Sequence, residues 1–161
     1  MRIRYHRLNE RGFSLIELMI VVGLIGVLTT MAIPRFQAFQ AKAKIGEAKN
    51  LLTHIYTLQQ SYHLDNNVYV AWPTVYGRNG NTNNCNPHPN ARLIGFRIEP
   101  CVANDPVPRY GYLVPTANAS AFQARAQTGA AAANLVCPGD PAQTIIIDQS
   151  KRMTGQLNGC S

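Results

Sequence analysis

The stretch that decides the fold is Phe13–Pro34, which reads FSLIELMIVVGLIGVLTTMAIP. Glu17 is the one charged residue in it. At about 1.5 Å per residue these 22 residues would form roughly 33 Å of helix, enough to cross a bilayer core of about 30 Å. A surface helix of a soluble domain has a polar face, and this stretch has almost none. It therefore predicts a transmembrane helix.

The rest of the chain is much less apolar. Of its 161 residues 46% are hydrophobic and 14% are charged, yet the mean hydropathy is −0.12. Concentration of the apolar residues at the N-terminus excludes a multi-span membrane protein and a disordered chain, and the length suits one domain plus an anchor. The net charge of +7 is partly local, because four of the 15 basic residues lie within residues 1–12. The other basic residues are dispersed, so nucleic-acid binding stays possible but unsupported.

A short basic segment precedes the apolar stretch. Residues 1–12 hold four arginines against one carboxylate, Glu10, which predicts that this segment is cytoplasmic and that the chain beyond the helix is translocated. The segment ends in Gly12, directly before Phe13, and Glu17 follows four residues later. A glycine lets a protease bind extended backbone in a narrow site.

The segment RGFSLIELMIVVGLIGVLTTMAIPRF resembles the N-terminus of type IV prepilins, of the type IVa major-pilin kind, and of the related pseudopilins. The resemblance implies cleavage between Gly12 and Phe13 by a membrane aspartyl prepilin peptidase, followed by N-methylation of the Phe13 amine. It also implies assembly into a helical filament with the apolar helices at its centre. We therefore expect a cleaved leader at 1–12, a long helix at 13–64 with 13–34 in the membrane or filament core, and a head at 65–161.

Glu17 is expected to have a charged partner. A carboxylate inside a bilayer costs about 2.5–3.5 kcal/mol on insertion scales and usually has a function. In a staggered filament, Glu17 of one chain could meet the Phe13 amine of another. Breaking such a pair in apolar surroundings would leave a charge unpaired, so the pair would fix the register between chains. The alternative is an interfacial glutamate tolerated in a plain membrane anchor.

Gly23, Gly26 and Pro34 interrupt the apolar helix. Small residues allow close helix contact, and a proline removes one intrahelical hydrogen bond. Glycine and proline are common in transmembrane helices, so the composition alone assigns them no role. The family resemblance implies that the Gly26–Pro34 stretch can lose helicity in the filament and make it extensible.

After Pro34 the helical pattern becomes amphipathic and ends at the turn formers Asp65–Asn67. The apolar positions recur at steps of three or four and predict a stripe packed on the head, while Lys42, Lys44, Glu47, Lys49, Gln59 and Gln60 are expected on the remaining surface. The expected stripe is Phe36, Phe39, Ala43, Ala48, Leu51, Leu52, Ile55, Leu58 and Tyr62.

The head is expected to contain a small antiparallel sheet. Residues 65–109 are rich in proline, glycine and asparagine and read as a long ordered loop region. Strands are expected at 109–114, 120–128 and 143–149, with a further one at 153–157. Packed on the amphipathic half of the helix, they predict an α+β, pilin-like fold.

All four cysteines lie on the translocated side, where an even count favours disulfides. Of three possible connectivities we favour Cys85–Cys101 and Cys137–Cys160, because each would close one irregular segment. In type IV pilins a disulfide brackets a C-terminal loop, and the resemblance implies the same for Cys137–Cys160.

Motifs for catalysis are missing from the sequence: it has no phosphate-binding glycine loop, nucleophile elbow, H-E-x-x-H or paired carboxylates. Cys85 with His88 is too small a set for zinc, and Asp140 with Asp148 too small for calcium. We therefore expect no cofactor, no metal and no enzymatic activity.

The resemblance implies a structural subunit of a type IV pilus that serves motility or adhesion. The implied partners are other copies of the chain, the prepilin peptidase, an inner-membrane assembly platform, a cytoplasmic assembly ATPase and minor pilins. The chain would be held in the bacterial inner membrane and then enter an extracellular filament. The alternatives are a pseudopilin of a type II secretion system and a minor tip pilin that binds surfaces or DNA.

Overall fold

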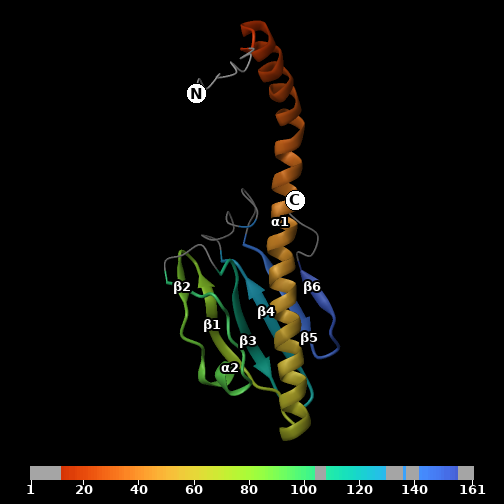
Figure 1. The fold of residues 1–161 in the computed structure, drawn as a ribbon. Helices are drawn as coiled ribbons and strands as arrows, with labels where there is room; N and C mark the ends of the chain where they lie inside the picture. The colour runs from red at the N-terminus through yellow and green to blue at the C-terminus, as the bar shows by residue number, and fades with distance from the viewer. Residues whose placement is uncertain (1–11, 104–107, 130–135, 137–141, 156–161) are drawn as a thin grey trace, which may run out of the picture. The chain divides into compact units, whose positions relative to one another are not determined.

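The computed structural model describes residues 12–103, 108–129, 136 and 142–155, and in it a long helix precedes a six-stranded sheet (Figure 1). Neighbouring strands are antiparallel throughout, in the order β2-β1-β3-β4-β5-β6. The expected α+β class is confirmed. The elements are α1 (Leu15–Asn66), β1 (Trp72–Asn79), β2 (Thr82–Asn84), α2 (Pro89–Leu93), β3 (Gly111–Ala117), β4 (Phe122–Gln127), β5 (Thr144–Asp148) and β6 (Met153–Gly155).

The chain forms two compact units, residues 1–37 and 38–161, and the boundary falls within α1. The second unit, called the head below, holds the sheet and the part of α1 from Ala38 onward, which crosses one face of the sheet (Figure 1). α1 ends where Asn67 takes a left-handed conformation, with φ of 54°, and donates its backbone N–H to the His63 carbonyl. Asparagine tolerates that conformation better than most residues do, which explains why the helix stops there.

The buried stripe of α1 begins in a different phase from the one expected. Phe36, Phe39 and Ala43 are exposed. Steps of four and three residues instead place one face of the helix on the sheet, with the fully buried side chains of Ala41, Ile45, Ala48, Leu52, Ile55 and Gln59. The sequence pattern assigned the phenylalanines to the buried face because they are large and apolar. The structure buries an alanine there instead, and its small side chain lets helix and sheet approach closely.

Gln59 is the second correction on this helix. It was expected on the polar surface, but its side chain is fully buried. Its amide is satisfied by the backbone of Val70, which follows the helix. A buried amide with both its donor and its acceptor paired avoids the desolvation cost that excludes glutamine from most cores.

The region 65–109 is not the long loop that the sequence suggested. It contains strands β1 and β2 and the short helix α2. The strands form a hairpin whose register pairs Asn79 with Thr82, and Gly80 turns the chain with φ of 65°. Asn-Gly is a strong hairpin signal, and the high asparagine content around it masked the signal in the sequence.

The other strands lie close to their expected positions, as β3, β4, β5 and β6. The core between sheet and helix is aromatic. The ring of Phe96 lies 5.9–6.0 Å, centroid to centroid, from those of Trp72, Tyr76 and Tyr112. Edge and offset ring packing of this kind contributes beyond the buried area alone. It fixes the segment after α2 against the sheet.

Candidate assembly site

The N-terminal segment places the Gly12–Phe13 junction directly before a helix. Gly12, Phe13 and Ser14 precede the first turn of α1, and the Phe13 side chain is 81% exposed. A Cβ atom on Gly12 would meet no atom within 4 Å. Glu17 lies in the first turn of the helix. The structure thus presents Gly12, Phe13 and Glu17 within one exposed stretch.

Ser14 begins the helix and was missed in the sequence analysis. Its hydroxyl accepts a hydrogen bond from the Glu17 backbone N–H at 3.3 Å, and its carbonyl accepts one from Leu18. Ser14 and Glu17 have the S-x-x-E spacing of a capping box, a signal that the sequence did contain. The cap places Glu17 in the first turn of α1, four residues after Phe13, which precedes the helix.

The first unit exposes an apolar surface on all sides of α1. This helix is the one candidate for a membrane span among the described residues, and none of its most apolar stretch is buried. An exposed apolar surface of this size requires lipid or another protein around it. Its large exposed side chains are Leu15, Ile16, Leu18, Met19, Ile20, Val21, Val22, Leu24, Ile25, Val27, Leu28, Met31 and Ile33.

The residues expected to weaken the helix lie within continuous helix. α1 runs without a break through Gly23, Gly26 and Pro34. The hydroxyl of Thr29 donates to the Gly26 carbonyl at 2.9 Å, and that of Thr30 donates to the Val27 carbonyl at 2.7 Å. Both hydroxyls are thereby satisfied inside the helix, which suits an apolar environment.

An ion pair attaches α1 to the sheet within the head. The Arg109 guanidinium, just before β3, donates to the Glu47 carboxylate at 2.6 Å, and both side chains are about one third exposed. Partial burial, with Arg109 nearby, lowers the pKa of Lys44 below its usual value. Burial also raises the pKa values of Tyr110 and Tyr112, and the Glu47 carboxylate raises them further. The Glu47 carboxylate therefore pairs with the Arg109 guanidinium and raises the pKa values of both tyrosine hydroxyls.

A disulfide joins Cys85, just after β2, to Cys101. This is the first of the two pairs that the sequence favoured. Cys137 and Cys160, which would form the second pair, lie outside the described residues. Because Cys85 is bonded to Cys101, it cannot join His88 in a zinc site, and His88 instead caps α2 by accepting from the Asn90 N–H through Nδ1 at 3.1 Å.

Metal-binding residues do not gather in the part of the chain that the structure describes, where no group of three or more His, Cys, Asp or Glu side chains comes together. Asp148 accepts hydrogen bonds from the backbone N–H groups of Ser150 and Arg152 and pairs with the Arg152 guanidinium. Its carboxylate thus stabilises the turn between β5 and β6. Asp140 lies outside the described residues.

Residues 7–33 match the family described as the prokaryotic N-terminal methylation motif. This match includes Gly12, Phe13 and Glu17, the residues that the structure places around the start of α1.

Three named relatives are similar to part of the chain. The type IV major pilin protein PilA of Myxococcus xanthus is 44% identical over 77 residues, which cover 48% of this chain and 35% of that protein. The type IV major pilin protein PilE of Neisseria gonorrhoeae is 36% identical over 64 residues, covering 40% of this chain and 36% of the relative. A fimbrial protein of Pseudomonas aeruginosa is 37% identical over 65 residues, which cover 40% of this chain and 42% of that protein.

The chain thus spans about two fifths or less of the length of these curated relatives. The motif match and these relatives make part of the chain similar to proteins named type IV major pilin and fimbrial protein.

Proposed function

We propose that the chain is a structural subunit of a type IV pilus and performs no catalysis itself. The observation that carries the proposal is the placement of Phe13 and Glu17 at the start of a helix whose apolar side chains are exposed on every side. Such a helix is stored in the inner membrane and is then transferred into the core of a filament. The transfer is feasible because the lipid and the filament core both surround the helix with apolar groups. The relatives named as major pilins and fimbrial proteins support this reading.

The proposed processing begins at the Gly12–Phe13 bond. A prepilin peptidase removes residues 1–12 on the cytoplasmic side and the Phe13 amine is N-methylated, in agreement with the methylation motif. Assembly then needs the inner-membrane platform, the cytoplasmic ATPase and minor pilins. The heads are exported, and the filament lies outside the cell.

Glu17 is proposed to set the axial position of each incoming subunit. Glu17 is four residues after Phe13, and a helix that included both would put the carboxylate about one turn from the new amine of the same chain. A neighbouring chain displaced along the filament axis can bring its Phe13 amine to Glu17. The pair then neutralises two charges that apolar surroundings would penalise. Loss of helicity between Gly26 and Pro34 belongs to the same proposal, as the source of extensibility.

A pseudopilin of a type II secretion system is the second candidate, because pseudopilins are processed at the same motif. The family resemblance weighs against it, since it associates C-terminal disulfides, such as the expected Cys137–Cys160 pair, more with pilins and calcium with major pseudopilins. A minor tip pilin would share both the motif and the fold. The sharp difference between these candidates is the cellular fraction in which the processed chain accumulates.

The deciding experiment is intact mass and N-terminal sequencing of protein sheared from the cell surface. The expected chain is abundant, begins with methylated Phe13 and is lighter than the reduced chain by two hydrogens for each disulfide. A processed chain confined to the membrane would support the pseudopilin, and a trace amount at the surface would support a minor pilin. An unprocessed chain in the membrane would overturn the proposal.

A further inference from the structure

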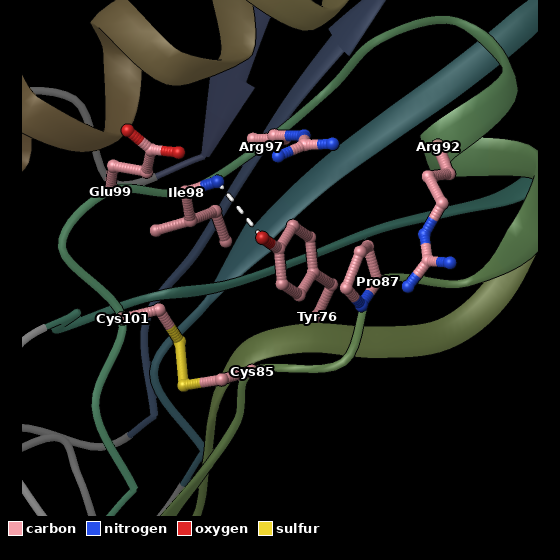
Figure 2. A pocket seen from close by; sticks show the side chains of 8 residues that line it. All are labelled: Tyr76, Cys85, Pro87, Arg92, Arg97, Ile98, Glu99 and Cys101. Atoms are coloured by element: carbon pink, nitrogen blue, oxygen red, sulfur yellow. Dashed lines mark hydrogen bonds between the residues drawn. A yellow bond between two sulfur atoms is a disulfide. The ribbon is translucent and has the colours of Figure 1, made fainter.

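The head contains a pocket that the assembly proposal does not use. It has a volume of about 490 Å³ and opens between the segment after β2, α2 and the segment Arg97–Cys101 (Figure 2). This volume lies within the usual range of small-ligand sites, about 300–1,000 Å³. Its lining includes Arg92, Arg97 and Glu99 together with the Cys85–Cys101 disulfide.

Two arginines bring positive charge to this pocket. Arg92 lies in the last turn of α2, and Gly95, with φ of 80°, reverses the chain so that Arg97 returns to the same pocket. Arg92 donates one long hydrogen bond, 3.4 Å, to the Asn86 side chain. Within the described ranges neither guanidinium forms an ion pair with a carboxylate, although Glu99 lines the same pocket. Both guanidinium groups therefore keep most of their N–H donors available for a ligand.

The walls of the pocket are held in place by contacts beneath it. The disulfide ties the end of β2 to the segment that carries Arg97. The Ile98 backbone N–H donates to the Tyr76 hydroxyl at 3.0 Å, as Figure 2 shows. The Asn90 side chain fixes α2 by donating to the Ala71 carbonyl at 2.7 Å. A pocket whose walls are fixed loses little entropy when a ligand binds.

The charges in the pocket are mixed, and this narrows the class of ligand. Figure 2 shows Glu99 and Arg92 on opposite sides of Tyr76, with Arg97 between them in the view. Guanidinium forks bind carboxylates and phosphates, whereas a carboxylate accepts hydrogen bonds from hydroxyl groups and repels a second anion. The arrangement fits a ligand with one anionic group at one end and neutral hydroxyl groups at the other.

Nucleic acid fits this pocket less well. Single strands bind through aromatic platforms on which bases stack, along a groove of uniform positive charge. Tyr76, the one aromatic residue of the lining, is buried and its hydroxyl is engaged by Ile98.

We propose that this pocket binds a hexuronic acid, an acidic sugar such as those in surface polysaccharides, with its carboxylate on Arg92 and Arg97 and its hydroxyl groups on Glu99. Binding is a property of the single head and does not require that the chain assembles into a filament. The pocket would give the exported head a specific contact with polysaccharide outside the cell.

The test uses the full chain in non-ionic detergent and fluorescently labelled oligogalacturonate, followed by anisotropy at low salt. The double substitution Arg92→Gln and Arg97→Gln is expected to weaken binding more than about tenfold, because each removes a charged hydrogen bond. Lys42→Gln removes the same charge from an exposed position on α1 and is expected to leave the affinity unchanged. Undiminished binding by the double variant, or an equal loss in Lys42→Gln, overturns the proposal.

Glu99→Ala separates a sugar site from a general anion site. Removal of this carboxylate is expected to weaken the binding of oligogalacturonate severalfold, because the sugar hydroxyl groups lose their hydrogen-bond acceptor. A purely electrostatic site would instead bind more tightly, and that result overturns the sugar assignment. A single-stranded oligonucleotide that competes equally, through the same two arginines, would assign the pocket to nucleic acid instead. No binding of oligogalacturonate at low salt rejects the site altogether.

Discussion

The side-chain amide of Gln59 pairs with the backbone of Val70 on both of its edges. Gln59 Nε2 donates to the Val70 carbonyl at 2.6 Å, and Gln59 Oε1 accepts from the Val70 N–H at 2.9 Å. The pairing imitates one rung of a β-ladder and fixes the chain where it turns from α1 toward β1. Because Gln59 and Val70 are both buried, water cannot replace either bond.

Gln59→Leu is expected to destabilise the head by about 2–4 kcal/mol. The substitution leaves the Val70 N–H and carbonyl without partners, at about 1–3 kcal/mol for each buried group. Urea unfolding of the full chain in detergent, followed by the fluorescence of Trp72, measures the effect, since Trp72 is the one tryptophan and is fully buried. Gln123→Leu, at an exposed position of β4, is the matched control and should change stability by less than about 0.5 kcal/mol.

Replacement by phenylalanine is expected to have opposite effects on stability at Tyr110 and at Tyr112. The Tyr110 hydroxyl donates to Gln143 Oε1 at 3.0 Å, whereas the buried Tyr112 hydroxyl has no partner among the described residues. Tyr110→Phe should cost about 1–2 kcal/mol, because it leaves the Gln143 oxygen unpaired. Tyr112→Phe should leave the stability unchanged or raise it, since it removes an unpaired buried hydroxyl. Equal losses in the two variants would contradict this assignment.

The raised pKa values of the same two tyrosines predict that the head becomes less stable at high pH. Burial, and then the Glu47 carboxylate, raise the pKa values of Tyr110 and Tyr112 above the ordinary value of about 10, so the folded head holds protons that the unfolded chain releases. The stability should be independent of these groups below pH about 10 and fall as the pH rises further, by at most about 1.4 kcal/mol per pH unit for each phenol. Urea titrations at several pH values measure this slope, which Tyr112→Phe should reduce.

The sequence predicted the long helix, the α+β class and four of the strands, because those features follow from local periodicity. It missed the β1–β2 hairpin, where Asn79–Gly80 lies within a run of other turn formers. The phase of the buried stripe was also missed. That phase depends on where the sheet lies, which makes Ala41 buried and Phe39 exposed, and a sequence pattern contains no such information.

The candidate assembly site was easier to read because it is a local motif. Gly12, Phe13 and Glu17 lie within six residues, and Ser14 completes a capping box in the same stretch. The pocket beside the disulfide could not be read in this way. Arg92 and Glu99 face one cavity because Gly95 reverses the chain, and the Cys85–Cys101 bond closes it from a distant segment.

Gly111→Ala should destabilise the head strongly. Gly111 lies opposite Gly77 in the β1–β3 register, and a Cβ atom there would overlap the Arg78 carbonyl and the Val75 side chain. Because backbone cannot move aside cheaply, we expect a loss of about 2 kcal/mol or more. Gly46→Ala on α1 is the control, since its Cβ atom would meet nothing within 4 Å and alanine favours helix by about 1 kcal/mol. The two variants should therefore shift the urea midpoint in opposite directions.

Removal of the Cys85–Cys101 bond should cost about 3 kcal/mol. The bond closes a loop between residues 16 apart, and loops of this size gain about that much from restriction of the unfolded chain. The double substitution Cys85→Ser and Cys101→Ser tests this in the same urea assay. An unchanged midpoint would show that contacts such as the Tyr76–Ile98 hydrogen bond hold the segment without the disulfide.

Glu17→Ala should block assembly while leaving earlier steps intact. The substitution makes the helix more apolar, so membrane insertion should not suffer, and the Gly12–Phe13 bond itself is unchanged. The lost carboxylate removes the proposed partner of the Phe13 amine in a neighbouring chain, which leaves that amine unpaired in apolar surroundings. Surface shearing followed by immunoblotting should find processed chain in membranes and a severe loss from the filament fraction.

Two controls separate register from helix capping. Ser14→Ala removes the hydroxyl that accepts the Glu17 backbone N–H and should cost about 1 kcal/mol of local helix stability without removing the carboxylate. If the cap alone mattered, this variant would lose filaments as fully as Glu17→Ala. Glu17→Asp keeps the charge on a shorter side chain and should restore part of the yield. Normal filament yield from Glu17→Ala would refute the register role, because no charge would then be needed at that position.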